Sequence, residues 1–318
     1  MTQVVVTKSV AVLAVILGML VLTQFMQLDA TAGDDQNPLL LELNKAGKSE
    51  AQLTALLDRY AKEKFKQVSI SDIRSALPEL LRHIGSTDSH LRDGLIFSAF
   101  YYWIYKYRLI DIKTIRLLLP IMTGDDFMFK QIGNRESDSV FTRTFSVVVL
   151  PFFLERHLET PYLRDEEVML IKRKLIRYIS LERDRRGYVV GKGWAHGIAH
   201  AADPIESLAR CRSMKKSDLA ELLKTIKSAV CEKNIGYLYG EDNRLISGVL
   251  SIIKRGLITD PEINQWINGF SDKNLNDTGK TVNERVLLDS NIKNFLKSLY
   301  FRLNWAGLDR FSITVKSA

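Results

Sequence analysis

Two histidines in a short glycine-rich and alanine-rich segment are the residues of this sequence best suited to chemistry. His196 and His200 are four residues apart, in a stretch that begins at Trp194 and is otherwise made of small side chains. We expect a helix to begin near Trp194, which would place both imidazoles on one face, about one turn apart. Metal sites use this spacing, and the small neighbours would let a ligand or another backbone come close.

Three roles are compatible with the histidine pair. As packed residues, the imidazoles would bond backbone carbonyls or the carboxylates of Asp184 and Asp242. As a general acid or base, one imidazole would be oriented by a carboxylate such as that of Asp184. As ligands of zinc or another divalent metal, they would need a third protein ligand, with four candidates in the sequence: Asp203, Asp93, Asp138 and His90. Gly197 stands where the zinc-protease motif has glutamate, which excludes that class of enzyme.

Asp203 has two possible roles of its own. It lies three residues after His200 and could add a carboxylate to a metal site. It also precedes Pro204 and Glu206 in the pattern of a helix start, with aspartate as N-cap, proline first and glutamate third. Because proline disfavours a helical conformation in the residue before it, we expect Asp203 to cap a new helix rather than to bind a metal.

A second set of polar residues recurs close to predicted helix starts and turns: Arg92, Asp93, Arg143, Asp184, Arg186, Asp242 and Arg244. Pairs of aspartate and arginine can form a ladder that ties stacked helices together and fixes their geometry. Alternatively, the arginines converge on a concave face beside Trp194 and hold an anionic ligand by bidentate contacts. The ladder is the expected arrangement, since paired charges are mostly structural.

Apolar residues recur at the spacing of amphipathic helices along most of the chain. The pattern predicts helices over 50–65, 71–84, 91–107, 111–122, 138–157, 164–182, 216–233, 242–257, 260–270 and 282–303. Pro78, Pro120 and Pro151 should kink or divide these stretches. The alternation typical of a strand is confined to Ser312–Val315. Short polar connections favour antiparallel neighbours, so we expect an all-α fold of stacked antiparallel helix pairs, either a HEAT-like α-solenoid or an α/α toroid.

The N-terminal region differs from the rest. No charged residue occurs between Ser9 and Leu28, and Lys8 is the only charged side chain before this run. The run is long enough to span a bilayer, which needs about 20 residues, and residues 30–32 offer a small-x-small cleavage site. We therefore expect residues 1–32 to be a signal peptide or membrane anchor, 33–38 a linker, and 39–318 a single all-α helical-repeat domain outside the cytoplasm.

Charge and cysteine content narrow the function classes. The 318 residues carry a net charge of +8, spread in short runs such as 172–174 and 215–216 on predicted helices. Nucleic-acid-binding proteins usually cluster such charge and interleave it with aromatic residues, so we expect solvated helix faces and no nucleic-acid partner. Cys211 and Cys231 fall near the ends of successive predicted helices, and we expect no disulfide between them.

Four stretches together resemble a bacterial family catalogued as domain of unknown function 2785. They are GSTDSHLRDGLIF at 85–97, DSVFTRTFSVVVL at 138–150, ERDRRGYVVGKGWAHGIAHAAD at 182–203 and EDNRLISGVL at 241–250. The family is similar to helical-repeat proteins, so the resemblance implies an all-α fold but no particular activity. The chain departs from the family pattern at Pro204, where a helix usually continues, and in its leading apolar segment.

These observations lead to two hypotheses for a protein exported across, or anchored in, the bacterial inner membrane. In the first, it is a binding or scaffold module whose polar groove around Trp194 to Asp203 engages a protein, a glycan or an anionic ligand. In the second, it is a hydrolase-type enzyme that uses His196 and His200, with or without a metal. The enzyme requires both imidazoles to face an accessible cavity with acids nearby.

Overall fold

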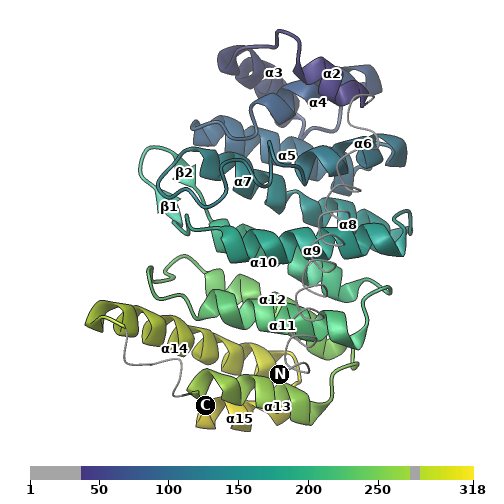
Figure 1. Ribbon diagram of the computed structural model, residues 1–318. Coiled ribbons are helices and arrows are strands. Elements are labelled where there is room, and N and C mark those ends of the chain that lie inside the picture. Colours follow the sequence, from purple (N-terminus) through teal and green to yellow (C-terminus); the bar gives the residue numbers. More distant parts are fainter. Residues whose placement is uncertain (1–36, 273–279) are drawn as a thin grey trace, which may run out of the picture. The chain divides into compact units, whose positions relative to one another are not determined.

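A computed structural model describes residues 37–272 and 280–318 of the chain (Figure 1). The predicted signal peptide or membrane anchor, residues 1–32, lies outside the described residues. Within the described ranges, no helix combines the length and the apolar character needed to cross a membrane. The chain divides into two compact units, one ending at Ala46 and the other beginning at Gly47. The described part of the first unit contains helix α2 (Pro38–Leu43), which Asn37 caps by accepting a hydrogen bond from the Leu39 amide at 3.0 Å.

The second unit is helical over most of its described length, which confirms the predicted all-α class. Its helices are α3 (Glu50–Lys62), α4 (Ile70–Arg82), η2 (His90–Ile96), α5 (Phe97–Phe100), η3 (Tyr101–Lys106), α6 (Ile112–Met122), α7 (Ser139–Val148), α8 (Leu150–Glu159), α9 (Asp165–Leu181), α10 (Gly197–Arg210), α11 (Lys216–Val230), α12 (Glu241–Lys254), α13 (Asp260–Asn268), η4 (Gly269–Ser271), α14 (Val282–Trp305), η6 (Asp309–Phe311) and α15 (Ser312–Ser317).

Helix α10 occupies a central place in this unit. It packs against α7, α8 and α9, which precede it in the sequence, and against α12, which follows it. Helix α12 in turn packs against α14. Figure 1 shows α7, α10, α12 and α14 following one another as neighbouring rows. Segments more than a hundred residues apart are thereby brought together around the start of α10.

Local signals explain where several helices begin. Asp111 caps α6 by accepting from the Thr114 amide at 2.7 Å, and Thr281 and Glu284 form a capping box at the start of α14. Pro151 lies in the first turn of α8 and separates it from α7, so the predicted stretch 138–157 is divided as expected. Pro78 lies inside α4, which runs on past it.

The prediction of a strand at Ser312–Val315 is wrong, because these residues belong to helix α15. Phe311 and Val315 are both buried and stand four residues apart, a spacing that serves one face of a helix. Four residues of alternating polarity are too few to distinguish the two-residue period of a strand from the 3.6-residue period of a helix. The helix instead packs against α13 and α14.

The strands that the structure does describe were not predicted. β1 (Tyr188–Val189) and β2 (Gly193–Trp194) form an antiparallel pair in which Tyr188 faces Trp194. Gly191 and Gly193 have positive φ angles of 75° and 81°, a conformation that glycine adopts readily. The glycine-rich connection between α9 and α10 is therefore a short hairpin.

Candidate functional site

The candidate site is built where helix α10 begins. His196 is the residue before the helix and has a left-handed backbone, with φ 51° and ψ 42°. The helix thus begins at Gly197, later than predicted, and His196 stands at its entrance. Gly197 is required there, because a Cβ atom would lie 2.6 Å from the carbonyl oxygen of Asp184. Although only His200 lies within the helix, the two imidazole rings are 5.3 Å apart between centroids, as the spacing led us to expect.

A series of rings leads from the surface to the second histidine. The Trp194 ring is 38 % exposed and stacks on His196 with centroids 4.3 Å apart. His200 is buried and meets the Phe145 ring edge-on at 5.1 Å. On the outer side, the rings of Tyr188 and Tyr239 contact Trp194 at 5.1 and 5.5 Å. The hairpin therefore carries the tryptophan that covers the histidine pair.

Trp194, His196, His200 and Phe145 are among the residues that line a cavity of about 330 Å³. Five of its lining residues were singled out from the sequence, namely Asp93, Trp194, His196, His200 and Arg244. They come from η2, β2, the entrance and first turn of α10, and α12. The remaining wall is apolar and was not predicted as part of a site: it consists of Phe97, Phe145 and Val148. The helical period of apolar residues predicts that such side chains are buried, but it does not predict which of them border a cavity.

Both imidazoles are held in the neutral form. Burial lowers the pKa of His196 to about 4, and the positive charge of Arg244 adds to this effect. Burial also lowers the pKa of His200 well below its ordinary value, helped by Arg244 and by His196. A neutral imidazole has one nitrogen that donates and one that accepts a hydrogen bond. The pair can therefore offer both kinds of contact at neutral pH.

The two histidines also have unused hydrogen-bonding capacity. The Nδ1 atoms of His196 and His200 are buried, and neither has a hydrogen-bond partner among the described residues. Leaving a buried polar atom without a partner costs roughly 1–3 kcal/mol. At these atoms the imidazoles bond neither Asp184 nor Asp242, whereas His200 does have a backbone hydrogen-bond partner, Thr144, as the interpretation of packed histidines allowed.

Asp203 and Arg244 form an ion pair beside the cavity. The Nε atom of Arg244 donates to Oδ1 of Asp203 at 2.8 Å, and Nη2 contacts the other carboxylate oxygen. Helix α10 continues through Pro204, so the prediction that Asp203 caps a new helix is wrong. Proline removes one backbone hydrogen bond from a helix, but the buried neighbours Ile205 and Leu208 hold α10 together here.

Arg92 and Asp93 tie helix η2 to the hairpin. Arg92 is fully buried, its guanidinium lies 4.1 Å from the centroid of the Phe141 ring, and its Nη2 atom donates to the Lys192 carbonyl at 2.6 Å. Asp93 pairs with Arg92 at 2.8 Å and accepts from the Trp194 amide at 3.4 Å. Burial raises the pKa of Asp93, against the lowering effect of Arg92. Asp93 is the member of this pair that borders the cavity.

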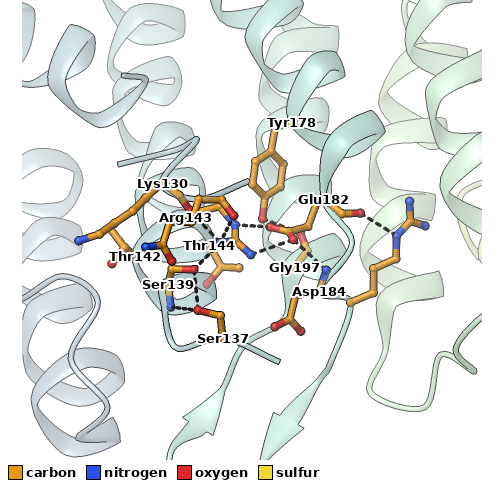
Figure 2. Close-up of polar contacts among 12 residues, drawn as sticks. Lys130, Ser137, Ser139, Thr142, Arg143, Thr144, Tyr178, Glu182, Asp184 and Gly197 are labelled. Atoms are coloured by element: carbon orange, nitrogen blue, oxygen red, sulfur yellow. Dashed lines mark hydrogen bonds and ion pairs between the residues drawn. The ribbon is translucent and has the colours of Figure 1, made fainter. Parts of the chain in front are cut away.

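Six of the predicted site residues do not line the cavity: Arg92 and Asp203, whose contacts are given above, and Arg143, Asp184, Arg186 and Asp242. Arg143 forms a buried ion pair with Glu182 (Figure 2). Asp184 pairs with Arg186. The carboxylate of Asp242 accepts a hydrogen bond from the Ser298 hydroxyl. The structure therefore does not bring Asp184 together with the histidines as a catalytic partner. Arg143, Arg186 and Asp242 each contact another protein side chain, but only the Arg186–Asp184 contact is the aspartate–arginine pair that the ladder interpretation describes.

The donor set does not fit a metal ion. Over residues 37–272 and 280–318, no group of three or more histidine, cysteine, aspartate or glutamate side chains is placed to hold one. All four candidates for a third ligand have other partners: Asp203 is engaged by Arg244, Asp93 pairs with Arg92 at 2.8 Å, His90 with Asp58 at 3.0 Å, and Asp138 with Lys192 at 2.7 Å. The zinc interpretation of the histidine pair therefore has no third ligand in the described chain.

Both cysteines, Cys211 and Cys231, are free thiols.

Comparison with known proteins places most of this site inside a family match. A family model with the description "Protein of unknown function (DUF2785)" matches residues 128–301. The matched region includes α7, the hairpin, α10 and α12, and it therefore contains both histidines and Arg244, whereas Asp93 precedes it. Neither the curated proteins nor the solved structures provide a match to this chain.

Proposed function

Because the chain belongs to the DUF2785 family, whose description assigns no activity, we propose a function from the geometry of its cavity. We propose that the protein is a binding module that holds a small organic anion beside His196 and His200. The sequence alone left a protein, a glycan and an anionic ligand as candidates. The chemistry of the cavity favours the last of these.

The observation that carries the proposal is that both histidines line the cavity and that each has a buried Nδ1 atom without a hydrogen-bond partner among the described residues. Buried polar atoms in proteins nearly always have partners, and exceptions of this kind gather at sites that a ligand or water completes. His196 also has a left-handed backbone, which is uncommon for a residue other than glycine. Residues with such strained backbones cluster at functional sites, as buried polar atoms without partners do. Both features occur on one residue, at the entrance of α10.

Two features define the class of ligand. Arg244 has five N–H donors, and the bidentate pair with Asp203 leaves some of them for another acceptor. Arg244 is the one cationic side chain among the described residues that line this cavity, it lowers the pKa of both histidines, and it is the group that an anion would contact, although the carboxylate of Asp93 borders the cavity as well. The opposite wall, Phe97, Phe145 and Val148, suits an aromatic or compact aliphatic group. A carboxylate attached to a ring satisfies both walls.

The helix packing supports a scaffold role for the rest of the chain. The contacts of α7 with α10, of α10 with α12 and of α12 with α14 are those of neighbouring layers in a helical stack. We propose a HEAT-like arrangement in preference to a closed toroid. In such a stack the cavity lies on elements whose positions are set by their neighbours, which suits a preformed site.

A hydrolase-type enzyme is the second candidate, because two uncharged imidazoles border the cavity, but a pKa of about 4 makes His196 a weaker base than an ordinary histidine. A histidine that is uncharged at neutral pH can take a proton from water. However, the lining residues include no serine, threonine or cysteine, so the reaction would need water as the nucleophile. Hydrolysis of an aryl carboxylate ester that is lost in both His196→Gln and His200→Gln would favour this candidate over simple binding.

We also propose that the N-terminal apolar run, Ser9 to Leu28, directs the chain to the bacterial inner membrane and places residues 39–318 outside the cytoplasm. Cell fractionation and N-terminal sequencing of the mature chain test this proposal. Recovery of the intact chain in the soluble cytoplasmic fraction would contradict it.

The ligand itself is best identified from cells. The full-length protein is purified, heated to release small molecules, and the extract is compared by mass spectrometry with that from Arg244→Gln. Arg173→Gln, which removes an exposed arginine on α9, is the matched control. We expect one or a few organic acids to be enriched on the wild type and on the control but absent from Arg244→Gln. Equal enrichment on all three proteins would contradict the proposal.

A further inference from the structure

We infer that a second cavity, separate from the histidine site, binds a phosphate group. This cavity has a volume of about 130 Å³ and is lined by four arginines, Arg135, Arg183, Arg185 and Arg186. It shares no lining residue with the cavity beside His200. The inference therefore stands independently of the proposed function.

Two of the arginines that line this cavity, Arg185 and Arg186, are held by ion pairs. Arg186 makes a bidentate pair with Asp184, with nitrogen–oxygen distances of 2.8 and 2.6 Å. Arg185 pairs with Glu232 at 2.8 Å, and Glu232 also accepts from the Asn234 amide at 2.6 Å. Asp184 and Glu232 are both buried. These contacts neutralise the two buried carboxylates and hold Arg185 and Arg186 in place.

The other two arginines remain available. Arg135 and Arg183 are exposed, and no hydrogen bond or ion pair engages either side chain within the described parts of the chain. Three acids line the cavity, the buried Asp184 and Glu232 and the exposed Glu136, so four arginines against three carboxylates leave one positive charge. This excess resides on side chains that are free to close on a ligand.

The geometry of the donors indicates the ligand. Guanidinium groups present planar forks of N–H donors that match the oxygens of a phosphate, and several arginines around one point are typical of phosphate recognition. The cavity is a few times larger than the roughly 30 Å³ that one water molecule occupies in the liquid, so it accepts a phosphate group but not a large substituent. The rest of a phosphate ester would extend into solvent.

The test is calorimetric titration of the full-length protein with inorganic phosphate, at constant ionic strength. The variants are Arg135→Gln and Arg183→Gln, with Arg173→Gln as an exposed-arginine control. Each charge-assisted contact that is lost should weaken binding about tenfold. We expect that loss in the first two variants and wild-type affinity in the control, with unchanged thermal unfolding in all three.

Vesicles distinguish a soluble phosphate compound from a lipid headgroup. Phosphatidylcholine vesicles with and without phosphatidic acid are compared for binding to the same proteins. Binding that requires phosphatidic acid, Arg135 and Arg183 would support a lipid phosphate, and binding of free phosphate alone would support a soluble one. No saturable binding to either, or an equal loss in Arg173→Gln, would overturn the inference.

Discussion

Arg143 and Glu182 form an ion pair that has no contact with solvent, between α7 and the end of α9. The Nε and Nη2 atoms of Arg143 donate to the two carboxylate oxygens at 2.7 and 2.9 Å, and both side chains are 0 % exposed (Figure 2). Glu182 also accepts from the Asp184 amide at 2.9 Å. The pair therefore fixes the start of the connection that leads to the hairpin and to His196.

Removing one member of this pair should destabilise the protein strongly. We expect Arg143→Met to lower the free energy of unfolding by about 3–5 kcal/mol, because Glu182 would be left buried without its counter-charge. Urea denaturation followed by circular dichroism measures the change. The double substitution Arg143→Met with Glu182→Leu should cost less than the sum of the two single ones.

Arg108→Met provides the matched control for this experiment. Arg108 pairs with Glu159 at 2.7 Å, but both side chains are largely exposed, and exposed pairs contribute about 1 kcal/mol or less. If Arg143→Met lowers the free energy of unfolding no more than Arg108→Met does, the buried pair does not stabilise the fold as we expect.

Gly197→Ala should disturb the entrance of α10. Its Cβ atom would lie 2.6 Å from the Asp184 carbonyl oxygen, and such overpacking typically costs about 1–3 kcal/mol. The same substitution at Gly94 meets its nearest atom at 3.5 Å, an ordinary contact. We expect thermal unfolding at a clearly lower temperature in Gly197→Ala than in Gly94→Ala. Equal unfolding temperatures would mean that the backbone at Asp184 can move away from the added Cβ atom without loss of stability.

Much of the fold and part of the site could be predicted from the sequence because they depend on local spacing. The three-to-four period of apolar residues identified the helices, and the four-residue spacing brought His196 and His200 together. Pro204 shows where local rules fail. Proline disfavours a helical conformation in the residue before it, but the burial of Ile205 and Leu208 outweighs this preference and the helix continues. The arginine partners have no local signal either, because Arg143 and Glu182 are 39 residues apart in the sequence.

The stability of the protein should fall on mild acidification because of the histidine pair. Above pH 6.5 His196 is neutral in both the folded and the unfolded chain. As the pH falls from 6.5 towards 4, the unfolded chain takes up a proton that the folded protein does not, because the folded pKa is about 4. The depressed pKa of His200 acts in the same direction. The free energy of unfolding should therefore decrease over this range.

Urea denaturation between pH 7 and pH 5 measures this dependence. The decrease should be smaller in a variant carrying His196→Gln and His200→Gln than in the wild type. Arg173→Gln, which removes an exposed side chain on α9 and leaves every histidine in place, should keep the slope of the wild type. An identical slope in the double variant would show that the two imidazoles are not held neutral by the fold.

The central claim, that the cavity beside His196 and His200 holds an organic anion, is tested most directly by paired calorimetric titrations of the full-length protein. Benzoate, 2-naphthoate and indole-3-acetate are each compared with the uncharged carboxamide of the same shape. We expect at least one carboxylate to bind more tightly than its amide, by about tenfold or more for a charge-assisted contact, and this preference to disappear in Arg244→Gln. If no carboxylate is preferred over its amide, or if the preference survives in Arg244→Gln, the assignment of the cavity is contradicted.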